Sequence, residues 1–154
     1  MQLSEFLDFD AIKPSLSAGN KRVVLQQLAQ IAAARLDVDP GEVLSSVSER
    51  ERLGSTGFGH GVAIPHGKID GLNRIYCLFA RLSDPVDYKS IDGQRVDLVF
   101  LLLSPPDAGA EHLKALAAVS RVTRHAPTLE KMRGARSRDA LAAVLLGADE
   151  RDAA

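Results

Sequence analysis

Disulfide bonds, an excess of charge and long apolar runs are all missing from this sequence. The one cysteine, Cys77, cannot form a disulfide within the chain, and a single cysteine suits a reducing compartment. The formal net charge is −1, so no basic excess indicates a nucleic-acid partner. The longest strongly apolar run, Leu98 to Leu103, is far too short to cross a bilayer. Residues 1–6 lack the basic start and apolar run of a signal peptide, so we expect a cytoplasmic protein without membrane insertion.

What is present is typical of a globular protein. Hydrophobic residues make up 45% and charged residues 25% of the 154 positions, so we expect a single domain spanning residues 1–154. Helices are predicted at residues 21–36, at 40–54 after an N-cap at Asp39, at 111–125, and after N-caps at Thr128 and Ser137. Strands are predicted at residues 61–66, 74–82 and 96–103. The last strand is apolar at nearly every position, as a strand covered on both faces would be, which favours an α/β domain with helices on both faces of one sheet.

Three further expectations concern the C-terminal third. The helix over 111–125 should bury Leu113, Leu116 and Ala117. The basic side chains that follow are expected to form a solvated face: Lys131, Arg133, Arg136 and Arg138. Residues after Gly147 are expected to fray.

The segment from Arg50 to Lys68 is the most informative part of the chain. It contains four glycines between positions 54 and 61, the hydroxyl pair Ser55–Thr56, and His66 after a proline. Each glycine loses more backbone freedom on folding than another residue would. A run of glycines indicates that the backbone must closely approach another group, and we expect this group to be phosphate.

Three familiar motifs do not fit this segment. A P-loop needs four residues between its glycines, but Gly61 and Gly67 enclose five and no hydroxyl residue follows Lys68. The dinucleotide fingerprint opens a helix, whereas these glycines precede a predicted strand. A zinc-protease histidine pair is separated by four positions, and His60 and His66 are six apart.

What remains is a histidine suited to nucleophilic attack on phosphorus. Imidazole can attack when one ring nitrogen is unprotonated and the other is held by a hydrogen bond. We expect the His66 ring to stand exposed in a hollow lined by amides. The candidate phosphate-binding groups around it are Ser55, Thr56, Gly57, Gly67 and Lys68, with Arg50 as a further cation. The spacing alone is equally compatible with a structural interpretation, in which residues 54–61 form a tight loop and His66 only ends a strand.

The motif Arg50-Glu-x-x-Gly-Ser-Thr-Gly-x-Gly-x-Gly-x-Ala-Ile-Pro-His66-Gly-Lys68 resembles the active-site signature of type 2 IIA proteins of the bacterial phosphotransferase system, above all their nitrogen-regulatory branch. Residues 92–100 and 103–106 resemble that family's central strand and exit turn. The motif His112-Leu-Lys-Ala-Leu116 resembles its second histidine motif. The resemblance implies a mixed central sheet and no metal or organic cofactor.

The same resemblance implies site roles. His66 would accept a phosphoryl group, His112 would lie beside it, and Arg50 would contact the phosphate or a partner. The donor would be the histidine-containing phosphocarrier protein of the nitrogen branch. The targets would be cytoplasmic regulatory proteins such as potassium transporters or sensor kinases. His60 stands where relatives of this branch often have asparagine, and we give it no catalytic role.

Three other functions stay open. The first is a stand-alone IIA component for mannitol or fructose uptake, which passes the phosphoryl group to a IIB partner. The second is a metal-dependent hydrolase using His60, His66 and His112, although no convincing carboxylate ligand lies near the motif. The third is a phosphate- or nucleotide-binding module that forms no covalent intermediate.

Overall fold

Six strands form one mixed β-sheet within residues 1–153, the part of the backbone that the computed structural model describes. The strands are β1 (Lys13–Leu16), β2 (Gly57–Gly59), β3 (Val62–Ala63), β4 (His66–Lys68), β5 (Tyr76–Val86) and β6 (Val96–Ser104). The helices are α1 (Lys21–Leu36), α2 (Pro40–Arg52), α3 (Ala110–Thr123), α4 (Ala126–Gly134) and α5 (Arg138–Ala153). Two short 3₁₀ turns, η1 (Leu3–Glu5) and η2 (Phe9–Ala11), precede β1. Side chains are described for residues 1–150.

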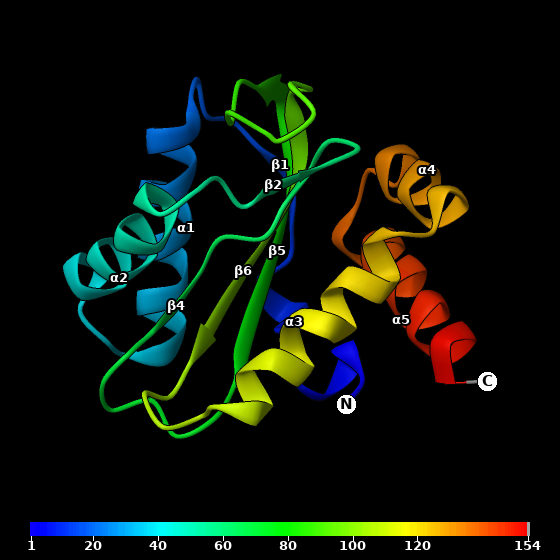
Figure 1. The fold of residues 1–154 in the computed structure, drawn as a ribbon. Coiled ribbons are helices and arrows are strands. Elements are labelled where there is room, and N and C mark those ends of the chain that lie inside the picture. Colours follow the sequence, from blue (N-terminus) through cyan, green and yellow to red (C-terminus); the bar gives the residue numbers. More distant parts are fainter. Residues whose placement is uncertain (154) are drawn as a thin grey trace.

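The sheet separates two helical layers. Its strand order is β1-β5-β6-β3-β2, and β4 also pairs with β6. Helices α1 and α2 cover one face, and α3, α4 and α5 cover the other (Figure 1). The predicted α/β fold with helices on both faces of a mixed sheet is therefore confirmed. None of the helices in the described part of the chain has the length and apolar character needed to span a bilayer.

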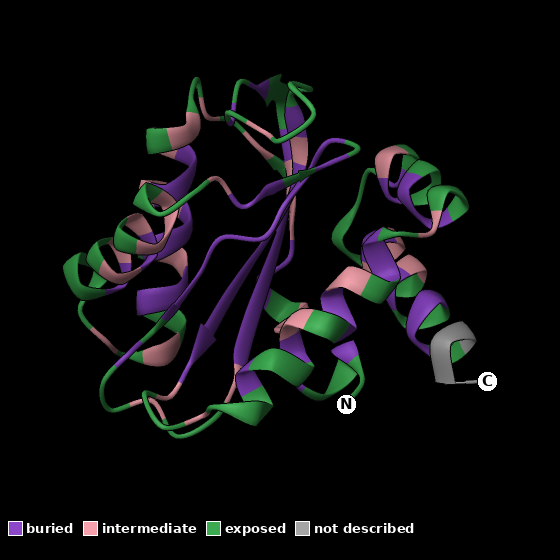
Figure 2. Ribbon diagram, viewed as in Figure 1, coloured by how far each residue is buried: buried purple, intermediate pink, exposed green. Residues whose placement is uncertain are grey.

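Strand β6 is the centre of the core. Leu98, Phe100 and Leu102 belong to the apolar cluster on the α3–α5 face, because alternate residues of a strand point to opposite faces. Val99, Leu101 and Leu103 belong to the cluster on the α1–α2 face. The predicted strand with both faces covered is thus confirmed, and Figure 2 shows β6 buried along nearly all of its length.

The single strand predicted over residues 61–66 is wrong in its boundaries. The chain runs parallel to β6 in two pieces, with Val62 opposite Leu98 and His66 opposite Leu102. Between the pieces lies Pro65, which has no N–H to give to a ladder, although its carbonyl still accepts from the Leu102 amide at 2.9 Å. His66 therefore begins β4.

Helix boundaries follow the capping residues on the α1–α2 side. The side chain of Asn20 accepts from the Val23 amide at 2.9 Å, and that of Asp39 accepts from the Glu42 amide at 3.1 Å. Helix α1 has the predicted limits, and α2 ends at Arg52, two residues before the predicted end.

The predicted buried face of α3 is wrong at two of its three positions, although Leu116 is partly buried and packs against the core. Leu113 is 67% exposed, and Ala117 is also exposed. The buried stripe lies one position away, about 100° around the helix axis: His112, Ala115, Ala118, Val119 and Val122. Alanines at two of these positions allow close packing, and the shift turns His112 toward the sheet.

Two other expectations for the C-terminal part need correction. Thr128 is not an N-cap: α4 begins at Ala126 after His125, and the Thr128 hydroxyl bonds to His125 Nδ1 at 2.8 Å. The backbone of residues 148–153 does not fray, because α5 continues to Ala153; residue 154, to which the same expectation applied, lies outside the described residues. The N-cap role of Ser137 is confirmed, since its hydroxyl oxygen accepts from the Ala140 amide at 3.1 Å.

The reason for the ordered end is Asp149. Its side chain is buried and accepts from the backbone amides of Leu3 at 2.8 Å and Ser4 at 2.9 Å. One carboxylate thereby joins the last helix to the first turn of the chain.

We predict that Asp149→Ala lowers the free energy of unfolding by about 1–3 kcal/mol, because it leaves two backbone amides without their charged acceptor. Glu150→Ala, at an exposed neighbouring position, is the matched control and should change stability by less than about 0.5 kcal/mol. Urea denaturation of both variants measures the difference. Equal stabilities would show that the Asp149 contacts contribute nothing.

Candidate functional site

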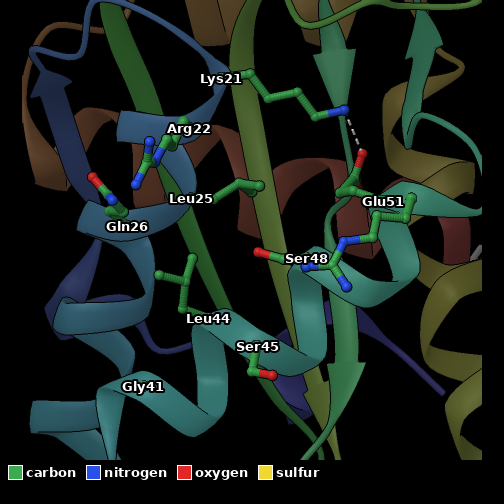
Figure 3. A pocket seen from close by; sticks show the side chains of 10 residues that line it. Lys21, Arg22, Leu25, Gln26, Gly41, Leu44, Ser45, Ser48 and Glu51 are labelled. Carbon is green, nitrogen blue, oxygen red and sulfur yellow. Dashed lines mark ion pairs between the residues drawn. The ribbon is translucent and has the colours of Figure 1, made fainter.

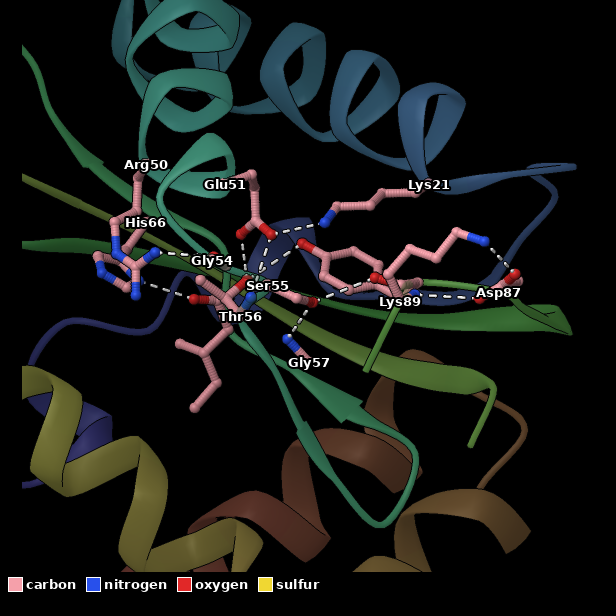
Figure 4. Close-up of polar contacts among 12 residues, drawn as sticks. Lys21, Arg50, Glu51, Gly54, Ser55, Thr56, Gly57, His66, Asp87 and Lys89 are labelled. Atoms are coloured by element: carbon pink, nitrogen blue, oxygen red, sulfur yellow. Dashed lines mark hydrogen bonds and ion pairs between the residues drawn. The ribbon is translucent and has the colours of Figure 1, made fainter. Parts of the chain in front are cut away.

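The side chain of Glu51 stabilises the glycine-rich loop after α2 through hydrogen bonds. Its carboxylate accepts from the Thr56 amide at 3.1 Å and from the Thr56 hydroxyl. Lys21 Nζ lies 2.8 Å from the same carboxylate, and the Glu51 side chain is only 6% exposed (Figure 4). Sequence reasoning missed Glu51 because it looked for cations and hydroxyls, although Glu51 lies inside the recognised motif.

The two hydroxyls of the loop bond to the protein itself. Thr56 is fully buried, and its hydroxyl also lies 3.2 Å from the Tyr88 hydroxyl. The Ser55 hydroxyl donates to the Tyr88 carbonyl and accepts from the Gly57 amide, both at 3.1 Å. These contacts fix the loop, and a phosphate-binding role for Ser55 and Thr56 stays a prediction that they do not support.

Two site glycines are required by close packing. A Cβ at Gly57 would overlap the hydroxyl of Ser90, in the segment between β5 and β6. A Cβ at Gly67 would lie 2.5 Å from the hydroxyl of Ser46 on α2. That hydroxyl also accepts from the Lys68 amide and donates to the Lys68 carbonyl, which ties β4 to α2. Gly67 thus lets α2 approach the strand that begins with His66.

His66 has a defined ring orientation. Its Nδ1 lies 2.8 Å from the Ile64 carbonyl oxygen. A carbonyl only accepts, so Nδ1 carries the proton and Nε2 keeps its lone pair. The exposed ring expected from the sequence is not found, because only 8% of His66 remains accessible.

His112 lies beside His66, as the sequence analysis expected. The two ring centroids are 5.4 Å apart. His112 Nδ1 shares a hydrogen bond of 2.6 Å with the hydroxyl of Ser104, the last residue of β6. Since β4 pairs with the end of β6 and α3 starts shortly after it, the topology brings both histidines to the same edge of the sheet.

Burial and positive charge keep both rings neutral. Burial has the largest effect on the pKa of His66 and lowers it. The hydrogen bond to Ile64 opposes this in part, and the smaller effects of Arg50, which lowers the pKa, and Glu51, which raises it, follow. Burial also lowers the pKa of His112, with help from His66 and Lys68. A neutral imidazole is the form that can act as a nucleophile.

Two cations lie near the histidine pair. Arg50, in the last turn of α2, donates from Nη1 to the Gly54 carbonyl at 2.8 Å, and Figure 4 shows its side chain with that of His66. Lys68 is exposed on β4, close enough for its charge to affect His112. Positive charges from two different elements, α2 and β4, therefore act on the histidine pair.

His60 lies apart from this arrangement. It occupies the turn between β2 and β3 with a φ of 58°, and its amide donates to Asp92 Oδ2 at 3.0 Å. Its carbonyl accepts from Arg133, which also pairs with Asp97 at 2.9 Å, so Arg133 is not part of a freely solvated basic face as expected. Within the described residues, no three His, Cys, Asp or Glu side chains are grouped so that they could hold a metal ion.

One protein family matches nearly the whole chain. The family model described as "Phosphoenolpyruvate-dependent sugar phosphotransferase system, EIIA 2" matches residues 5–147. The chain belongs to this family.

Individual relatives point to the nitrogen-regulatory branch of IIA proteins. A nitrogen regulatory protein of Bradyrhizobium diazoefficiens is 46% identical over 145 residues, which are 94% of this chain and 95% of the relative. The crystal structure of the nitrogen regulatory protein IIA-Ntr from Neisseria meningitidis matches with a TM-score of 0.87 and 30% identity, over 93% of this chain and 98% of that one. A fructose-specific EIIA component of Haloferax volcanii is 35% identical over 75% of this chain and 74% of its own length. The chain is thus a homologue of nitrogen regulatory proteins.

The lowered pKa values predict a pH effect on stability. An unfolded histidine takes up its proton near pH 6.5, whereas folded His66 and His112 take theirs up at lower pH. Between these points the unfolded state binds more protons, so stability falls as the pH drops through 6.5 and levels off below the folded pKa values. Above that window these two rings contribute no pH dependence.

Denaturation at pH 7.5 and 5.5 should therefore show a smaller loss of stability for His66→Gln than for the unchanged protein. NMR titration of the His66 ring gives its pKa directly. A ring that titrates at or above about 6.5 would contradict the assigned environment.

Proposed function

We propose that this protein accepts a phosphoryl group on Nε2 of His66, in the cytoplasm, from the phosphohistidine of a small carrier protein. In its two phosphorylation states it would then regulate different protein targets. The observation that carries this proposal is the hydrogen bond from His66 Nδ1 to the Ile64 carbonyl, beside His112. It leaves Nε2 as the nucleophilic nitrogen of a neutral ring.

The phosphoryl group would pass directly from the imidazole of the donor to that of His66. The lone pair of His66 Nε2 forms the new nitrogen–phosphorus bond while the donor's nitrogen–phosphorus bond breaks, and its electron pair returns to the donor imidazole. The proton of His66 stays on Nδ1 and remains hydrogen-bonded to the Ile64 carbonyl oxygen, which stabilises the positive charge that develops on the ring. His112, Arg50 and Lys68 supply hydrogen bonds or positive charge to the phosphoryl oxygens, which is the main contribution a protein makes to this chemistry.

Exposed leucines beside the site support docking of a protein donor. Leu53, at the end of α2, is 85% exposed, and Leu113, next to His112 on α3, is 67% exposed. Phe58 in the glycine-rich loop is 48% exposed. Exposed large apolar side chains are common anchors of a protein interface, because they are buried when the partner docks.

Phosphorylation would act on targets through charge. A phosphohistidine adds negative charge at the centre of this surface, so it can repel one partner and recruit another. The identity of 46% with a nitrogen regulatory protein, against 35% with a fructose component, favours targets of the regulatory kind, such as potassium transporters or sensor kinases.

Incubation with phosphoenolpyruvate and the upstream phosphotransferase proteins should place an acid-labile, base-stable phosphate on His66. His66→Gln should take up none, because no Nε2 nucleophile remains. His60→Asn is the matched control, since His60 is exposed and outside the pair, and it should label fully. A His66→Gln protein that still labels would refute the assignment, and a protein that never labels would leave only non-covalent binding.

The neighbours of His66 should affect the rate. His112→Gln should slow phosphoryl transfer without abolishing it. Arg50→Gln should cost about 1–3 kcal/mol of transition-state stabilisation, or about 5- to 150-fold in kcat/KM for the donor, if Arg50 makes a charge-assisted bond to the phosphoryl group. Rates equal to those of the unchanged protein would make the residue concerned a bystander.

The sugar-uptake alternative makes a different prediction. A sugar-specific IIA component would lose its label to a IIB domain, whereas a regulatory protein should keep it. A chase of the labelled protein with mannitol- and fructose-specific IIB domains separates the two, and rapid loss of label would favour sugar uptake.

A further inference from the structure

A cleft with a volume of about 690 Å³ lies between the packed helices α1 and α2 (Figure 3). This volume falls within the range of small-molecule sites, about 300–1,000 Å³. Leu25 of α1 and Leu44 of α2 provide its apolar lining, and Gln26, Ser45 and Ser48 provide uncharged polar groups. The proposed phosphoryl transfer gives this cavity no role.

The charge around the cavity is positive. Lys21, Arg22 and Arg52 line it, against one acid, Glu51. Lys21 and Glu51 pair at 2.8 Å and cancel, which leaves two guanidinium groups. Arg22 and Arg52 are exposed, and neither bonds to another side chain or carbonyl among residues 1–150. In a chain with a net charge of −1, this is a local concentration of unpaired positive charge.

The cavity also continues along the helices. A neighbouring hollow of about 390 Å³ shares Gln26, Gly41 and Leu44 with it and adds Ala29 and Pro40. A ligand whose charged end contacts the arginines therefore has room for an apolar body along α2. Guanidinium groups favour phosphate and carboxylate, which they can bind through two parallel hydrogen bonds.

We propose that the cleft between α1 and α2 binds a small amphipathic anion, with its phosphate or carboxylate group held by an arginine that lines the cleft, Arg22 or Arg52, and its apolar part on Leu25 and Leu44.

This site is connected to the His66 loop. Lys21 Nζ, at the edge of the cleft, lies 2.8 Å from Glu51 and 4.4 Å from the centre of the Tyr88 ring. Glu51 in turn holds Thr56 through its amide and hydroxyl. An anion in the cleft attracts Lys21 and so weakens its ion pair with Glu51. The charge of the carboxylate that holds Thr56 is then less well compensated. Occupancy of the cleft and the conformation of the loop are thereby coupled, and the coupling is reciprocal.

The test uses three probes that share a six-carbon chain: hexyl phosphate, hexanoate and the neutral hexanol. Each is titrated into the full-length ¹⁵N-labelled protein while backbone amide shifts are recorded. The anions should shift amides of residues 21–26 and 41–52 saturably, and hexanol should bind at least tenfold more weakly. Tighter binding of hexyl phosphate or of hexanoate supports the site in either case and tells which head group it prefers.

A charge-removing variant tests the residues. Arg22→Gln/Arg52→Gln should weaken binding of the better anion at least tenfold. Arg124→Gln/Arg136→Gln removes two exposed arginines elsewhere and should bind like the unchanged protein. Equal affinity in the two double variants, equal binding of hexanol, or no saturable shift with either anion would overturn the proposal.

The coupling has its own readout. Saturation of the cleft should shift the Thr56 amide as well, and Lys21→Gln should remove that distant shift while leaving shifts within the cleft. A Thr56 amide that does not move would overturn the coupling. None of these measurements needs phosphoryl transfer, so their failure is distinguishable from a failure of the function proposed for His66.

Discussion

The parallel pairing of one interrupted strand with β6 determines where the chemistry lies. β3 and β4 follow the same register along β6, and Pro65 separates them without moving the chain off its path. At this interruption the His66 ring turns back to the Ile64 carbonyl. The pairing with β6 places His66 near the end of that strand, beside His112 in the first turn of α3. Ring orientation, tautomer and the neighbouring histidine all depend on this arrangement.

A second constraint is the ion pair between the buried carboxylate of Glu51 and Lys21. Glu51 is nearly inaccessible, and its charge is compensated by Lys21 from another helix, so the carboxylate can hold the loop through Thr56. Removing Lys21 from this pair would leave an uncompensated buried charge on Glu51, which is costly. The same contact joins the acceptor site to the cleft between α1 and α2, so one ion pair serves both sites.

Much of the fold could be predicted from the sequence because its signals are local. Asp39 and Ser137 cap helices as expected, and the apolar run of β6 is typical of a strand covered on both faces, as the structure confirms. The buried face of α3 was missed because Leu113 and His112 differ by about 100° around the helix, and the choice between them depends on packing against β6. In the site, the motif pointed to His66, His112 and Arg50, but the contacts of Thr56 with Glu51 and Tyr88 arise only in the folded chain.

The proposed phosphoryl transfer depends on which nitrogen of His66 is available to phosphorus, and NMR of the phosphorylated, ¹⁵N-labelled protein measures this directly. We predict phosphorus–nitrogen coupling at Nε2, with a proton retained on Nδ1. Coupling at Nδ1 instead would show that the hydrogen bond to Ile64 does not set the reacting tautomer, and would contradict the mechanism.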